Sequence, residues 1–219
     1  MSHYEIRLLL GGLAMSFAVV TSMLVRKEKS VSIKILMLLI VLTLLNEIIA
    51  TIYAYKIGNS NIIYGFYNPI ELFLICLYYN YSIDNFTQGR IGIVIGTFGL
   101  LIGYVNYFII QSPWELNNFY LLFESLVVVF LCLYSFYRLL LSDDNLILTR
   151  SPHFWVTSNF LFYWTSTLFL WGTYGYLTKT AGIANDILLN VLLIVNIITY
   201  LGFGAIFILY NKMQTVNGR

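Results

Sequence analysis

Residues 35–55 read ILMLLIVLTLLNEIIATIYAY, and this stretch decides the fold class. A strand of a membrane barrel would alternate apolar and polar side chains with a period of two. Residues 35–45 show no such alternation and are apolar on every face. A helix needs about 20 mostly apolar residues to cross the hydrocarbon core of a bilayer. The stretch therefore predicts a membrane-spanning α-helix.

The same composition continues along the chain. Hydrophobic residues make up 59% of the 219 residues and charged residues only 10%, whereas a soluble domain carries roughly 25% charged residues. Short polar segments containing Gly, Asn, Asp or Pro separate the apolar runs. We therefore expect an all-α, polytopic membrane protein in which residues 1–219 form a single bundle of seven transmembrane helices. The expected spans are residues 5–25, 31–55, 61–82, 91–110, 117–141, 153–174 and 187–210.

The basic residues predict the orientation, because Lys and Arg accumulate in cytoplasmic segments. With the amino terminus outside, the outer segments hold Arg7, Lys56 and Lys179, and the other nine of the twelve basic residues lie inside. The cluster of Arg26, Lys27 and Lys29 follows the first apolar run, whereas a cleaved signal peptide has its charges before it. We expect the amino terminus outside and the carboxyl terminus in the cytoplasm.

Three carboxyl groups lie within the apolar runs, at Glu47, Glu71 and Glu124. Charges are costly in hydrocarbon, so such residues are functional candidates. The rise of about 1.5 Å per residue and alternating helix directions place them at similar depth, and we expect them to line one outward-facing cavity. No Lys or Arg lies at that depth. One interpretation is that at least one carboxyl group is protonated and donates a hydrogen bond. Another, compatible with the first, is that the carboxyl groups bind a cation, a proton in transit or an amine-bearing ligand.

Helical spacing adds polar neighbours to these carboxyl groups. Tyr120 stands four residues before Glu124, and Asn196 is expected near mid-depth in the last run. Pro69 lacks a backbone donor and is expected to kink its helix just before Glu71. The candidate ligand-binding or ion-binding residues are Glu47, Glu71, Glu124, Asn68, Asn196, Tyr67 and Tyr120.

Residues 91–110 carry four glycines at steps of four, three and four, which keep them on one helix face: Gly92, Gly96, Gly99 and Gly103. Small residues at this spacing let two helices approach closely. The partner helix belongs either to the same bundle or to a second copy in a homo-oligomer.

Several activities are excluded by the residue types present. His3 and His153 are expected at opposite membrane faces, so they cannot share a metal or haem, and neither is expected at depth beside a Ser. Cys76 and Cys132 form no Cys-x-x-Cys pair, which argues against a thiol-exchange activity. The basic residues form no patch for nucleic acid. We expect no metal and no cofactor.

The chain resembles uncharacterised small seven-helix integral membrane proteins of Bacteroidota. The resemblance rests on short motifs: Asn68-Pro69-Ile70-Glu71-Leu72-Phe73, Phe123-Glu124, and Ser151-Pro152-His153-Phe154-Trp155 leading to Asn159 and Tyr163. It implies a location in the bacterial inner membrane and an accessory or sensory role beside other membrane systems.

These observations favour a receptor-like or accessory signalling module that passes a signal to a protein partner at its cytoplasmic face. One alternative is a transporter or an oligomeric channel subunit, coupled to protons or cations, with a defence-associated membrane effector as a variant. Another is an intramembrane enzyme acting on lipid, in which paired carboxyl groups serve as acid and base. The enzyme is the least favoured, because no nucleophile, metal set or oxyanion motif accompanies the carboxyl groups.

Overall fold

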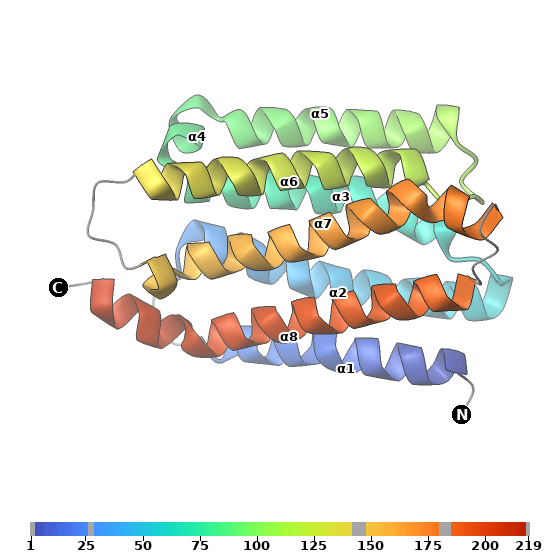
Figure 1. The fold of residues 1–219 in the computed structure, drawn as a ribbon, viewed down its shortest axis with the longest axis horizontal. Helices are drawn as coiled ribbons and strands as arrows, with labels where there is room; N and C mark the ends of the chain where they lie inside the picture. Colours follow the sequence, from blue (N-terminus) through green and yellow to red (C-terminus); the bar gives the residue numbers. More distant parts are fainter. Residues whose placement is uncertain (1–2, 26–28, 142–147, 180–184, 218–219) are drawn as a thin grey trace. The chain divides into compact units, whose positions relative to one another are not determined.

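The computed structural model describes residues 3–25, 29–141, 148–179 and 185–217, in which all regular structure is helical and no strand occurs (Figure 1). The all-α prediction is confirmed. Three basic residues that contributed to the predicted orientation lie outside the described residues, namely Arg26, Lys27 and Arg219. The long helices are α1 (His3–Met23), α2 (Val31–Ile57), α3 (Asn61–Ser82), α5 (Ile91–Val105), α6 (Asn118–Leu141), α7 (Pro152–Lys179) and α8 (Asn185–Asn217). The short elements are α4 (Asp84–Gly89), a π-helical turn η1 (Asn106–Ile110) and a 3-10 turn η2 (Leu148–Arg150).

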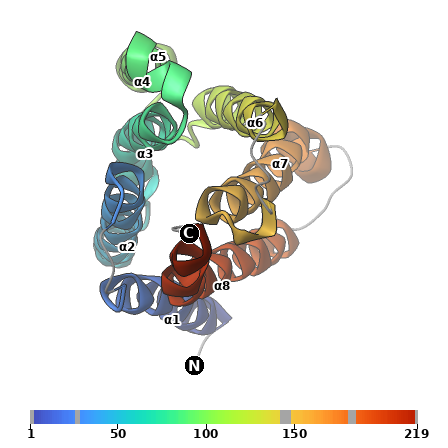
Figure 2. The ribbon, with the colours of Figure 1, turned by 90° about the vertical axis from the view of Figure 1, so that its left-hand side faces the viewer.

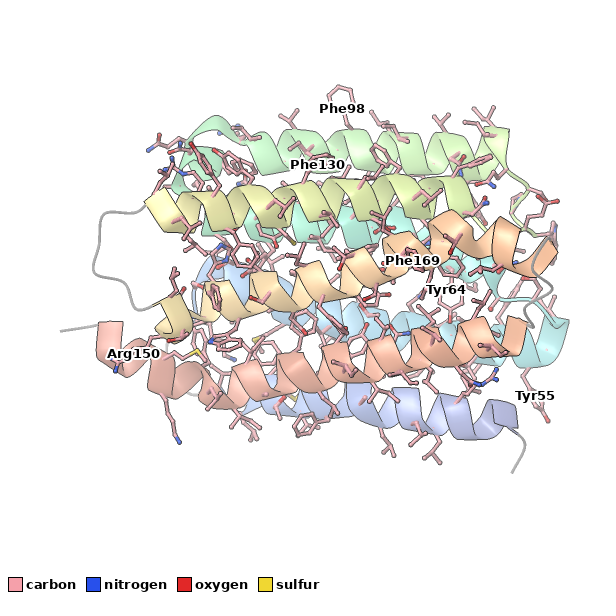
Figure 3. The ribbon with its side chains drawn as sticks, in the orientation of Figure 1. Tyr55, Tyr64, Phe98, Phe130, Arg150 and Phe169 are labelled. Atoms are coloured by element: carbon pink, nitrogen blue, oxygen red, sulfur yellow. The ribbon has the colours of Figure 1, made fainter. Side chains whose placement is uncertain are left out.

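Five helical stretches in the described part of the chain are long and apolar enough to cross a membrane: Val31–Ile57, Asn61–Ser82, Ile91–Ile110, Asn118–Leu141 and Ile187–Tyr210. Their outward surfaces carry large apolar side chains. Phe98 on α5 is 63% exposed and Phe130 on α6 is 67% exposed (Figure 3). Such surfaces are rare on soluble proteins and are suited to lipid. The protein is therefore a multi-pass membrane protein.

The chain forms two compact units, residues 1–28 with 129–219, and residues 29–128. In the first unit α8 packs against both α1 and α7. The Asn159 side chain on α7 donates to the Thr199 carbonyl of α8 over 2.8 Å, and Phe160 meets Phe203 edge to face. A hydrogen bond of this kind between two helices stabilises their packing by about 0.6 kcal/mol in a bilayer.

In the second unit α3 lies between α2 and α5 (Figure 2). Gly58 ends α2 with a left-handed backbone at φ 83°, and its amide donates to the Ala54 carbonyl over 2.8 Å. This conformation costs glycine little, and it allows α3 to begin at Asn61. The helix continues through Pro69 without a break, so a bend there stays a prediction.

The glycine face of α5 is buried against α3. A Cβ atom at Gly92 would clash with the Cys76 carbonyl, and one at Gly99 would lie 2.6 Å from Leu72. At Gly96 the neighbours are Phe73 and Cys76, and at Gly103 they are Pro69 and Tyr120. The absence of side chains on this face lets the two helices approach closely, and the partner of the glycines is a helix of the same chain.

Candidate functional site

Glu124 is the most unusual residue of the site. It lies on α6, is 0% exposed, and neither of its carboxyl oxygens has a hydrogen-bond partner among the described residues. Leaving a buried polar group without a partner costs about 1–3 kcal/mol. Most buried polar groups are hydrogen-bonded, so an orphaned carboxyl group calls for an explanation, such as a ligand.

Glu71 of α3 is close enough to Glu124 for the two carboxyl groups to interact electrostatically. Glu71 is partly buried. Cys76 and Tyr120 lie within the same range of Glu124. The structure thus brings together two of the three predicted glutamates. They come from helices that are not neighbours in the sequence, so only the tertiary fold unites them.

The helical segments that carry this pair contain no basic residue to neutralise it. Neither α3 nor the first half of α6 contains a Lys or Arg, and Arg138 is about four helical turns beyond Glu124. Two unscreened negative charges repel each other strongly in a medium of low dielectric constant. The pair is therefore stable only when a proton or a cation neutralises at least one carboxyl group.

The pair is not part of a larger metal-binding set. Within the described ranges, no three His, Cys, Asp or Glu side chains come together in a group that could hold a metal ion. Calcium needs six to eight oxygen ligands, and zinc needs about three or four protein ligands. The residues present thus favour a proton or a small monovalent cation over a divalent metal.

Tyr120 closes the site on the side of α5. It is 1% exposed, and its hydroxyl donates to the Gly99 carbonyl over 3.3 Å. A Cβ atom at Gly103 would lie 2.8 Å from the Tyr120 ring and 2.5 Å from Pro69. The rings of Tyr120 and Pro69 therefore occupy the hollow that Gly103 leaves on α5.

Glu47 has a separate partner. The hydroxyl of Tyr64, labelled in Figure 3, donates to Glu47 Oε2 over 2.8 Å, and the hydroxyls of Thr43 and Tyr67 are 2.6 Å apart. Both bonds join α2 to α3. Tyr64 precedes Glu71 by about two helical turns, so a single cavity shared by all three glutamates stays a prediction.

The two predicted amides lie in different units. Asn68 is buried on α3, one turn before Glu71. Asn196 lies on α8 in the unit formed by residues 1–28 and 129–219, where it is half-buried. Its approach to the glutamates stays a prediction.

A cluster of amides at the start of α6 was not expected as part of the site. Asn106 of η1 donates to the side chains of Asn117 and Gln111, the latter over 3.0 Å, and Gln111 donates to Asn118 over 2.7 Å. Asn117 is 7% exposed, and its Nδ2 has no partner in the described part of the chain. Spacing carried a signal, since Asn117 precedes Glu124 by seven residues, or about two turns.

A Ser–His contact at the start of α7 was not expected, while the expectation that neither His lies at depth beside a Ser stays a prediction. Ser135 Oγ on α6 is 2.8 Å from His153 Nε2 on α7, and Thr157 Oγ1 is 3.5 Å from the same hydroxyl. A hydroxyl beside an imidazole is the contact of nucleophilic enzymes. Ser135 is completely buried, however, so no substrate reaches it in this conformation, and the bond joins the end of α6 to the start of α7.

Similarity to known proteins does not assign a function to this site, so its function is inferred from its own residues. Comparison of the chain with protein-family models, with curated proteins and with solved structures finds no match.

Proposed function

We propose that this protein is a membrane transporter that moves protons across the bilayer. The Glu71–Glu124 pair takes up the proton on one side, and the proton is released on the other. One observation carries the proposal: Glu124 is fully buried in an apolar helix, and both of its carboxyl oxygens lack a partner among the residues that the structure describes. Carboxyl groups at such depth serve as proton relays in pumps and transporters.

A proton explains the site better than a fixed structural role does. A structural carboxyl group would gain stability from a donor, as Glu47 does from Tyr64. Glu124 has none, although Tyr120 lies one turn away and donates to the Gly99 carbonyl instead. The carboxyl group is thus left available for exchange.

The proposal includes the full predicted topology of seven spans, with the amino terminus outside, in a bacterial inner membrane. Besides the five apolar stretches, α1 contains the apolar segment Arg7–Met23, and α7 has 28 residues. About 20 residues suffice to cross the hydrocarbon core. Both helices are therefore added to the proposed count.

Cysteine labelling tests this orientation. Cys76 and Cys132 are buried, so an exposed cysteine added by substitution would report its own side of the membrane. In intact cells a membrane-impermeant maleimide is expected to label Tyr55→Cys, at the outer end of α2. The matched variant Gln88→Cys, at the inner end of α4, is expected to react only after permeabilisation. The reverse pattern would invert the topology.

Proton uptake tests the function. The purified protein, reconstituted into liposomes containing a pH-sensitive dye, is expected to acidify the lumen under an inward proton gradient. Glu124→Gln is expected to lower the rate by about 100-fold or more, the range by which positioned acids and bases act in proton transfer. Glu115→Gln, at an exposed carboxyl before α6, is the control and should keep the rate. Equal rates for Glu124→Gln and the unaltered protein would contradict the proposal.

The second candidate is the receptor-like module. It is favoured because Tyr120, which lies beside Glu124, also touches α5 where α5 packs on α3. Tyr120 touches Gly103, and Pro69 fills the same hollow, so protonation beside Tyr120 would alter how these helices pack. Such a change could be passed to a protein partner at the cytoplasmic face. A pH-dependent conformational change without any proton flux in liposomes would support this function over transport.

A further inference from the structure

We propose that the proton reaches Glu124 along one face of α6, from a water-binding station at Asn117, and that Tyr120 is the gate between the two. The proposal rests on the proposed function, because it assigns the route to the same acidic pair. It adds two residues with separate roles, a polar station and a movable ring.

Two orphaned polar groups define the ends of the route. Asn117 Nδ2 and the Glu124 carboxyl oxygens are buried without partners in the described part of the chain. Asn117, Tyr120 and Glu124 follow one another at steps of three and four residues, so they share a helix face and span about 10 Å. The Leu121 amide bonds to the Asn117 carbonyl over 3.0 Å, which extends the helical spacing back to Asn117.

Asn117 is suited to hold water. Its Oδ1 already accepts from Asn106, whereas its Nδ2 has no acceptor among the described side chains and backbone. Buried waters typically bind otherwise unsatisfied polar groups and need two to four polar partners. Asn117 belongs to a hydrogen-bonded cluster with Asn106, Gln111 and Asn118, and this cluster supplies the further polar groups that such a water needs.

Tyr120 separates this station from Glu124. Its ring fills the hollow at Gly103, and the side chain is 1% exposed. Its only polar contact among those given for the described residues is the 3.3 Å bond to the Gly99 carbonyl, which is long for a hydroxyl donor, since such bonds cluster near 2.7–2.8 Å. The gate opens when this weak bond to Gly99 breaks and the Tyr120 ring turns out of the Gly103 hollow.

The alternative route along α3 is less suited to an open path. There Tyr64 donates to Glu47, and the hydroxyls of Tyr67 and Thr43 pair with each other. These groups have found partners in the resting protein. The α6 face, by contrast, has orphaned groups at both ends.

The chemical step is a simple proton transfer. With the Tyr120 ring turned aside, water continues from Asn117 to the carboxylate of Glu124. A hydronium ion in this water gives its proton to a Glu124 oxygen, which becomes a neutral carboxyl group, and a water molecule remains. No oxidant or other reactant is needed.

The experiment uses the full chain in liposomes and measures proton uptake after a rapid pH jump. Tyr120→Phe keeps the ring and removes the bond to Gly99, so uptake is expected to become about 2- to 10-fold faster, which is the net strength of one hydrogen bond expressed as a rate. Tyr137→Phe, at an exposed tyrosine of the same helix, should not change the rate. Asn117→Leu is expected to slow uptake about tenfold by removing the donor for water.

The outcomes separate the route from the site. Faster uptake in Tyr120→Phe that still vanishes when Glu124→Gln is added would support the gate. Unchanged or slower uptake in Tyr120→Phe, with Glu124→Gln inactive, would overturn the gate and leave the acidic site intact. Full activity in Glu124→Gln would overturn the proposed function itself. Phenylalanine differs from tyrosine only by the hydroxyl group, so Tyr120→Phe is expected to fold. It therefore tests the role of Tyr120 as a gate even if Asn117→Leu does not fold.

Discussion

Glu124→Met is expected to raise the free energy of unfolding by about 1–3 kcal/mol while abolishing proton uptake. Both oxygens of Glu124 are buried without a partner in the described ranges of the chain, so the native side chain carries a desolvation penalty that an apolar replacement removes. Methionine is unbranched and flexible and fills a similar space. Unfolding of the two proteins by denaturant in the same detergent measures the difference.

Glu47→Met is the matched control and is expected to change stability in the opposite direction. Glu47 accepts from Tyr64, and its loss would leave that hydroxyl without this acceptor, at a cost of about 1–3 kcal/mol. A gain at Glu124 together with a loss at Glu47 would identify Glu124 as a site where function is kept at the expense of stability. If both variants are equally destabilised, Glu124 has a partner that the proposal does not include.

The helices were predictable because a bilayer leaves the backbone few choices. Inside hydrocarbon each backbone group must be satisfied within its own helix, so a long apolar run leaves little doubt about its structure. The expected span 61–82 coincides with α3, and 91–110 coincides with α5 and η1. The last helix is longer than its expected span of 187–210, since α8 continues to Asn217. Apolar composition marks the hydrocarbon region, whereas a helix can continue into the polar layer beyond it.

The partners of the acidic residues were less predictable, because they depend on how each helix is rotated about its axis. A helix that is apolar all round carries little periodic signal for that rotation. Glu71 and Glu124 could be selected from their cost in lipid alone. The bond between the hydroxyls of Tyr67 and Thr43 was not predicted, and neither was the bond from Tyr64 to Glu47.

Side-chain contacts between residues on different helices also could not be predicted from the sequence. Ser135 and His153 are 18 residues apart and belong to different helices, so no helical spacing relates them. The surroundings of Asn117 depend on the turn η1, whose first residue, Asn106, donates to both Gln111 and Asn117. The glycine spacing on α5 did predict a tertiary contact, because four glycines on one face have little use other than close approach.

Gly92→Ala is expected to lower the free energy of unfolding by about 1–3 kcal/mol, the usual cost of overpacking a tight interface. The added Cβ would clash with the Cys76 carbonyl and would lie 2.7 Å from Cβ and 3.0 Å from Cα of Asn80. Backbone atoms cannot rotate away as the end of a flexible side chain can. The helices α3 and α5 would therefore have to separate at this point, losing contacts on either side of it.

Gly12→Ala provides the control for this substitution. Gly12 also lies within a helix, but a Cβ there would meet nothing within 4 Å, so only the helix preference of alanine remains, a gain of about 0.5–1 kcal/mol. The two variants make the same chemical change and are expected to differ in sign when unfolded in one detergent. Equal stability of the two would mean that α5 does not pack on α3 through Gly92. In that case Tyr120 would also lose the hollow at Gly103 that makes it a gate, since the same helix contact forms both.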